Sequence, residues 1–185
     1  MSRLLEFIEK DPFAPIEKVL KEQCRPYIIE TKASPNFLYR GVDELLTRYI
    51  IRKPRMDRRP TDTPVNVSNR VDDMFQKKFG WRPRSQGVFA VASPELASEY
   101  GRPYIFVPLG KYEYLWSPKV EDMYATLKKD LELEVEEFSY YIKTYKSTGL
   151  TQALLTDHEV MFKCGSYILI DYDYRDRVLE VFTSQ

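Results

Sequence analysis

The sequence predicts a single α+β domain that covers residues 1–185. That length fits one compact domain, which can bury a core without disulfides or metals. Apolar runs of strand length and segments of helical period are both present along the chain. Fourteen tyrosines and ten phenylalanines supply large side chains for a core and argue against disorder.

The first 79 residues are expected to contain four helices and one strand. Residues 1–35 form an N-terminal helical segment, and residues 36–185 form the core of the domain. A strand over residues 36–40 ends at Gly41. The predicted helices of this region cover residues 2–10, 14–24, 42–49 and 67–79.

A buried strand followed directly by a short capped helix is the most distinctive unit. Gly87 to Ala92 is an apolar run with Val and Phe. Ser93 can cap the helix with its hydroxyl, Pro94 suits the first helical position, and Gly101 suits the end. Tyr100 is therefore expected at a fixed corner, where it can form part of a ligand platform.

The second half is expected to hold most of the strands. A long helical region over about residues 119–146 carries an acidic patch, which we expect to face water, with a partner surface as the alternative. The patch consists of Asp130, Glu132, Glu134, Glu136 and Glu137. The predicted strands cover residues 104–108, 112–116, 158–163, 166–172 and 177–182.

Composition excludes several classes of protein. Lys plus Arg equal Asp plus Glu, so the net charge does not demand a nucleic-acid or membrane partner. Cys24 and Cys164 lie far apart and His158 is the single histidine, which makes a His/Cys metal site unlikely to form. The N-terminus lacks the apolar core of a signal peptide, and no segment has the length of a membrane span. We expect a cytoplasmic protein without a metal.

Three separated segments resemble the ADP-ribosyltransferase superfamily, whose members cleave the nicotinamide–ribose bond of NAD. They are Tyr39-Arg40-Gly41, the unit from Gly87 to Tyr100, and Asp157-His158-Glu159 before an aliphatic run and Gly165-Ser166. The likeness covers roughly residues 36–172. It implies a split β-sandwich of two small twisted sheets with surrounding helices.

The resemblance also assigns roles in binding NAD. Arg40 would anchor the phosphates, and the Gly41 backbone would hydrogen-bond the nicotinamide amide. Phe89 and Tyr100 would flank the nicotinamide ring, at the spacing of the polymerase-like branch. Each of these aromatic residues could instead be an ordinary core residue, and Arg40 a surface ion-pair partner.

The chain departs from the Ser-Thr-Ser motif of the toxin-like branch. Val91-Ala92-Ser93 keeps the last serine alone, which leaves Ser93 as a candidate NAD-binding residue. The first serine of that motif helps to hold the catalytic glutamate. Either Ser85 or another hydroxyl replaces it, or the site is built differently.

Two carboxylates are the candidate catalytic residues. By resemblance, Glu159 would stabilise the positive charge that develops on the ribose, and Asp157 would orient or deprotonate the acceptor. If both lie on one strand, they project from the same face, whereas His158 points away and is structural. The alternative for the acid pair is a solvent-facing start of a strand.

The resemblance predicts a mono-ADP-ribosyltransferase with NAD as substrate and a macromolecular acceptor, expected to be a protein. Such enzymes include phage and bacterial effectors that act in the cytoplasm of a host cell. The alternatives are a catalytically inactive binding protein with the same fold, an NAD glycohydrolase, and a nucleic-acid ADP-ribosyltransferase. The basic loop from Arg52 to Arg59 could clamp the adenylate half of NAD, dock an acidic protein or nucleic acid, or simply be solvated.

Overall fold

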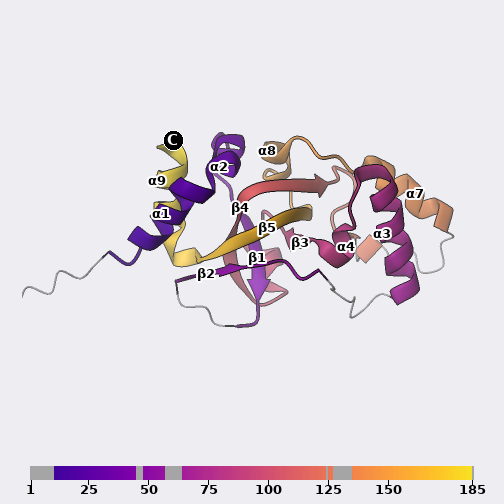
Figure 1. The fold of residues 1–185 in the computed structure, drawn as a ribbon, viewed down its shortest axis with the longest axis horizontal. Coiled ribbons are helices and arrows are strands. Elements are labelled where there is room, and N and C mark those ends of the chain that lie inside the picture. Colours follow the sequence, from indigo (N-terminus) through magenta and orange to yellow (C-terminus); the bar gives the residue numbers. More distant parts are fainter. Residues whose placement is uncertain (1–10, 45–47, 57–63, 124, 127–134, 185) are drawn as a thin grey trace, which may run out of the picture.

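The computed structural model describes residues 11–44, 48–56, 64–123, 125–126 and 135–184 (Figure 1). Within these residues the protein has the α+β class that the sequence predicts, with five antiparallel strands in one sheet. The strands are β1 (Leu38–Val42), β2 (Tyr49–Arg52), β3 (Val88–Ala90), β4 (Arg102–Trp116) and β5 (Val160–Asp171). The helices are α1 (Ala14–Gln23), α2 (Arg25–Thr31), α3 (Val65–Phe79), α4 (Pro83–Gln86), α5 (Pro94–Ser98), α7 (Val135–Thr144), α8 (Leu150–Ala153), the 3-10 helix η1 (Tyr172–Tyr174) and α9 (Arg175–Thr183).

The long antiparallel pair of β4 and β5 forms the centre of the sheet. Its register runs from Tyr104 opposite Asp171 to Trp116 opposite Val160. β1 pairs with the first part of β4, while β2 and β3 pair with different stretches of β5. Val91, directly after β3, exchanges backbone hydrogen bonds with Tyr39 of β1 at 2.7 and 3.0 Å. This contact brings the start of β1 next to the end of β3, although the two strands lie far apart in sequence.

The expected division into two small sheets is not confirmed, because the strands of the described residues form one open sheet. The sequence predicts a break in both central strands, at Gly110 and at Gly165. In the structure each strand continues through its glycine. In β4 the register shifts between Leu109 and Tyr112, and Gly110 adopts a φ of 68°. A bulge of this kind bends a strand without ending it.

Two apolar clusters cover the sheet. The larger cluster contains α1, α2 and α9, which pack against aromatic residues such as Phe106 and Phe162. The smaller cluster contains α3 and α7, together with Leu115 and Met161. Since Leu115 and Met161 alternate with strand residues of the larger cluster, the two clusters lie on opposite faces of this end of the sheet. In Figure 1 the two groups of helices lie at opposite ends of the molecule.

Two predicted helices and the predicted capped helix are confirmed. The helix predicted over residues 14–24 is α1, and the one over residues 67–79 is α3, which ends at Gly80 with a left-handed φ of 81°. The capped helix after Ser93 is α5. The helix predicted over residues 2–10, the acidic residues 130–134, the side chains of Glu136 and Glu137, and the end of the basic loop lie outside what the structure describes.

Other predictions of secondary structure are wrong. Residues 177–182 lie in α9 rather than in a strand, because Val178, Val181 and Phe182 follow helical spacing and are all buried. The helix predicted over residues 42–49 is contradicted at both ends, where Val42 belongs to β1 and Tyr49 to β2. The helix expected to reach residue 146 ends at Thr144, and Lys146 pairs with the backbone of Trp116.

Candidate functional site

The corner after α5 holds Tyr100 as the sequence predicts. The hydroxyl of Ser93 accepts a hydrogen bond from the Leu96 N–H at 3.1 Å and donates one to Glu95 Oε2 at 3.0 Å. Tyr100 follows this short helix, and its side chain is 58% exposed. A large exposed ring at a backbone-fixed corner can offer a flat face to a planar ligand.

The end of β1 lies directly against this corner. A Cβ added at Gly41 would meet the Ala97 carbonyl oxygen at 2.0 Å and the Tyr100 carbonyl carbon at 2.8 Å. A glycine is therefore required here by the close approach of two backbones. The structure thus brings together Gly41 and Tyr100, which the sequence places 59 positions apart.

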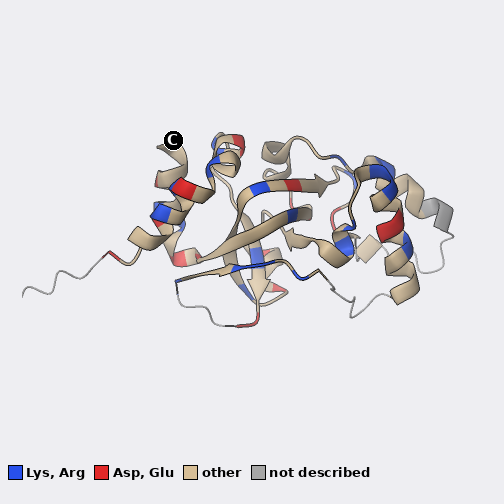
Figure 2. Ribbon diagram, viewed as in Figure 1, with Lys and Arg blue, Asp and Glu red and all other residues tan. Residues whose placement is uncertain are grey.

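Arg40 lies near two other arginines, Arg52 and Arg55. Its Nη1 donates a hydrogen bond to the Phe89 carbonyl oxygen at 2.8 Å. Burial lowers the pKa of the Arg40 guanidinium, and the charges of Arg52 and Arg55 lower it further, while Tyr167 opposes them. Arg52 also pairs with Glu44 at 2.5 Å, and Arg55 is exposed. These three arginines form a positive region near the end of β2, where the ribbon carries basic residues in Figure 2.

Glu159 is fixed by its backbone just before β5. Its N–H donates to the Glu121 carbonyl oxygen at 2.7 Å. Its Oε1 is buried. Besides burial, the negative charge of Glu159 is one cause of the raised pKa of Tyr100 and of Tyr145. Because Asp122, the residue after Glu121, bonds the Tyr100 hydroxyl, Glu159 lies in the same neighbourhood as Tyr100.

Asp122 is a second carboxylate in this neighbourhood. Its Oδ2 accepts a hydrogen bond from the Tyr100 hydroxyl at 3.2 Å. Burial, the charge and hydrogen bond of Asp122, and the charge of Glu159 raise the pKa of Tyr100 to about 12. Burial and the Glu159 charge also raise the pKa of Tyr145 well above its usual value. Both phenols therefore keep their protons to a higher pH than an ordinary tyrosine does.

We expect Tyr100 to titrate near pH 12 rather than near its ordinary pKa of 10.0. A raised pKa means that the folded protein holds this proton more tightly than the unfolded chain does. Its contribution to stability is therefore complete below pH 10 and is lost as the pH rises through about 12. Difference absorbance titration of the parent against Tyr100→Phe measures this group. A component that titrates at the ordinary value would contradict the expectation.

The outcome differs for Asp157, His158 and Phe89. Asp157 is exposed in a bend, and β5 begins at Val160, so the prediction that Asp157 and Glu159 share a strand is wrong. His158 Nδ1 lies 2.6 Å from the Ser117 carbonyl oxygen, which agrees with a structural role. Phe89 is half-buried and packs against the smaller apolar cluster.

Sequence reasoning missed Asp122, Tyr145 and Arg84. The Nε of Arg84 is buried without a hydrogen-bond partner in the part of the chain that the structure describes. Buried Asp72 accepts hydrogen bonds from the N–H groups of Arg84 and Ser85, at 2.8 and 3.0 Å, and so fixes the start of α4. A helix-capping pattern could have identified Asp122, but no local pattern links it to Glu159.

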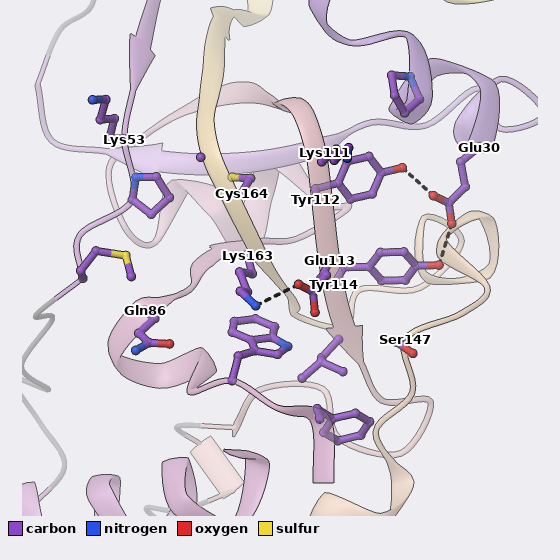
Figure 3. A pocket seen from close by; sticks show the side chains of 17 residues that line it. Glu30, Lys53, Gln86, Lys111, Tyr112, Glu113, Tyr114, Ser147, Lys163 and Cys164 are labelled. Carbon is purple, nitrogen blue, oxygen red and sulfur yellow. Dashed lines mark hydrogen bonds and ion pairs between the residues drawn. The ribbon is translucent and has the colours of Figure 1, made fainter. Parts of the chain in front are cut away.

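A separate open groove of about 1120 Å³ lies over the middle of β4 and β5 (Figure 3). Glu30 accepts hydrogen bonds there from the hydroxyls of Tyr112 and Tyr114, at 2.5 and 2.7 Å. Lys163 pairs with Glu113 at 2.9 Å. The seven predicted site residues are not among those that line this groove.

The described residues contain no cluster of three or more His, Cys, Asp or Glu side chains suited to a metal ion. None of the helices described is both long and apolar enough to cross a membrane. Comparisons of the chain with protein-family models, curated proteins and solved structures found no match.

Proposed function

We propose that the protein is a mono-ADP-ribosyltransferase with an ADP-ribosyltransferase-like fold, which transfers ADP-ribose from NAD to a macromolecular acceptor. The observation that carries the proposal is the meeting of Gly41, Tyr100 and Glu159 at one corner. Gly41 lies against the Tyr100 backbone, and the adjacent residues Glu121 and Asp122 bond the Glu159 N–H and the Tyr100 hydroxyl respectively. These residues come from the three segments that carry the sequence resemblance.

In the proposed complex the nicotinamide ring stacks on Tyr100 and its amide bonds the Gly41 backbone. Ser93 and Phe89 lie on the same strand–helix unit and would border the ring. A planar aromatic ring binds well on an exposed tyrosine face. The placement of Tyr100 next to a backbone that only glycine allows supports this subsite.

The diphosphate of NAD binds the positive region of Arg40, Arg52 and Arg55. Guanidinium groups suit phosphate oxygens because they donate several hydrogen bonds in one plane. The Arg40 guanidinium bonds the Phe89 carbonyl oxygen, which is a neutral acceptor and does not cancel the positive charge. Binding of NAD should therefore weaken as the salt concentration rises.

In the reaction, the bond between ribose C1′ and the nicotinamide nitrogen breaks, and nicotinamide leaves with the bonding electrons. Glu159 stabilises the positive charge that develops on the sugar. A nucleophilic atom of the acceptor then bonds to C1′ and loses its proton. Asp157 stays the candidate base, since an exposed carboxylate two residues from Glu159 is accessible to a macromolecule.

A non-catalytic NAD-binding protein is the second candidate. The Ser93 hydroxyl is engaged with Leu96 and Glu95, which favours a helix cap over a role in holding Glu159. The two candidates differ in turnover and share the binding of NAD.

Incubation of the protein with labelled NAD and a cell lysate tests the proposal, together with calorimetry of NAD binding. We expect heat of binding and label on a protein acceptor. Label on nucleic acid would identify nucleic acid, rather than protein, as the acceptor. Free ADP-ribose alone would indicate a glycohydrolase. Heat of binding without any product would favour the non-catalytic protein. Absence of both heat and label would overturn the assignment of NAD.

A further inference from the structure

Asp122 bonds Tyr100 from a segment to which the sequence assigns no role. Its Oδ2 accepts the hydrogen bond of the Tyr100 hydroxyl at 3.2 Å. The preceding residue, Glu121, accepts the backbone hydrogen bond of Glu159 at 2.7 Å. The two-residue segment 121–122 therefore connects Tyr100 with the backbone of Glu159.

Both oxygens of the Asp122 carboxylate have partners within the protein. Oδ1 accepts a hydrogen bond from the Ala125 N–H at 3.0 Å, as in a helix N-cap, and Oδ2 bonds Tyr100. The Asp122 carbonyl oxygen also accepts hydrogen bonds from Thr126. A carboxylate held in this way is suited to fixing another side chain rather than to contacting a substrate.

The Tyr100 ring is fixed at both ends despite its exposure. Its backbone is confined by Gly41, and its hydroxyl is held by Asp122. An exposed ring without the second contact would sample several rotamers. Ordering such a side chain when a ligand binds reduces the affinity, whereas a ring already in place avoids that cost.

We propose that Asp122 is a positioning residue, which holds the Tyr100 ring in place as a preformed stacking surface for the nicotinamide of NAD. The inference rests on the proposed function and names a residue that its site needs. Asp122 acts through Tyr100, so its loss changes the affinity for NAD more than the rate of the chemical step.

Two substitutions separate the contacts of Asp122. Asp122→Ser keeps a hydroxyl that can cap the Ala125 N–H but is too short to reach Tyr100. Asp122→Asn keeps groups that can bond both partners. Tyr100→Phe removes the hydroxyl while preserving the ring.

We expect Asp122→Ser and Tyr100→Phe each to raise the Kd for NAD, measured by calorimetry, by about 3- to 10-fold. The turnover rate at saturating NAD should change by less than about 2-fold, because the Tyr100 contact is made equally before and during the reaction. The double variant should bind no more weakly than either single variant, since both remove one interaction. Asp122→Asn should retain most of the affinity.

An unchanged Kd for Asp122→Ser, or additive losses in the double variant, would overturn the inference while the parent still labels its acceptor. If the parent neither binds NAD nor labels, the proposed function fails and the inference fails with it. If Asp122→Ser does not fold, the Kd of Tyr100→Phe for NAD tests the inference instead. An unaltered Kd in that variant would show that the hydroxyl contact has no role in binding. Glu121→Gln is the matched control, since Glu121 bonds Glu159 through its backbone carbonyl oxygen and its side chain is exposed.

Discussion

Glu159→Gln is expected to reduce the rate of ADP-ribose transfer by about 100-fold or more, because a preorganised group that meets developing charge contributes on this scale. Gln has nearly the size of Glu but carries no charge. The ribose would therefore lose its electrostatic stabilisation in the transition state. The affinity for NAD should change little, since the bound dinucleotide has no full positive charge on its ribose. Initial rates of labelling with purified acceptor, alongside calorimetry of NAD binding, measure the two effects.

Glu121→Gln provides the control for that substitution. It makes the same chemical change on an exposed side chain. The backbone carbonyl oxygen of Glu121, which bonds the Glu159 N–H, is kept. We expect it to label at the parental rate. Parental activity in Glu159→Gln would show that the carboxylate assigned to the ribose lies elsewhere.

Gly41→Ala is expected to destabilise the protein by about 3 kcal/mol or more, because a new methyl group would overlap a backbone that cannot easily move. The added Cβ would lie 2.0 Å from the Ala97 carbonyl oxygen and 2.9 Å from the Tyr100 Cβ. For a domain of this size the melting temperature should fall by roughly 6–12 °C. Thermal unfolding followed by circular dichroism measures the loss.

Gly165→Ala is the matched control for Gly41→Ala. A Cβ at Gly165 would meet no atom within 4 Å, so that substitution should cost far less. Equal melting temperatures for Gly41→Ala and the parent would contradict the close approach of β1 to α5. In folded Gly41→Ala protein we also expect weaker NAD binding, since α5 and Tyr100 would have to move.

The strand–helix unit could be predicted from sequence because its signals are local. Ser93 and Pro94 stand at the positions where a cap and a first helical residue have their own chemical requirements, whereas the helix ends at Ser98, before the predicted end at Gly101. The structure confirms the unit, with the Ser93 hydroxyl bonded to the Leu96 N–H. The corner that carries Tyr100 follows from these same signals.

The arrangement of the sheet could not be predicted in the same way. Glycines at positions 110 and 165 suggest ends of strands, but pairing between β4 and β5 continues past both. The energy of that pairing comes from residues that lie far apart in the chain. For the same reason Val178, Val181 and Phe182 read as a strand until the buried face of a helix is known.

Some residues of the candidate site could be predicted from short sequence segments, whereas others depend on contacts between distant segments. Arg40, Gly41, Tyr100 and Glu159 were found because each belongs to a short recognisable segment. The contact of Asp122 with Tyr100 crosses 22 residues and leaves no periodic pattern in the sequence. Asp157 was paired with Glu159 by strand alternation, which fails because β5 begins only after both residues.

The order of the strands has a consequence for synthesis of the chain. β2, β3 and β4 all pair with β5, which is the last strand of the described residues. A ribosome that has not yet translated residues 160–171 therefore holds a chain in which β2 lacks its neighbour and β4 can pair with β1 alone. Glu159 emerges immediately before this strand. The nascent polypeptide thus acquires its proposed chemistry only in the same late step that completes its fold.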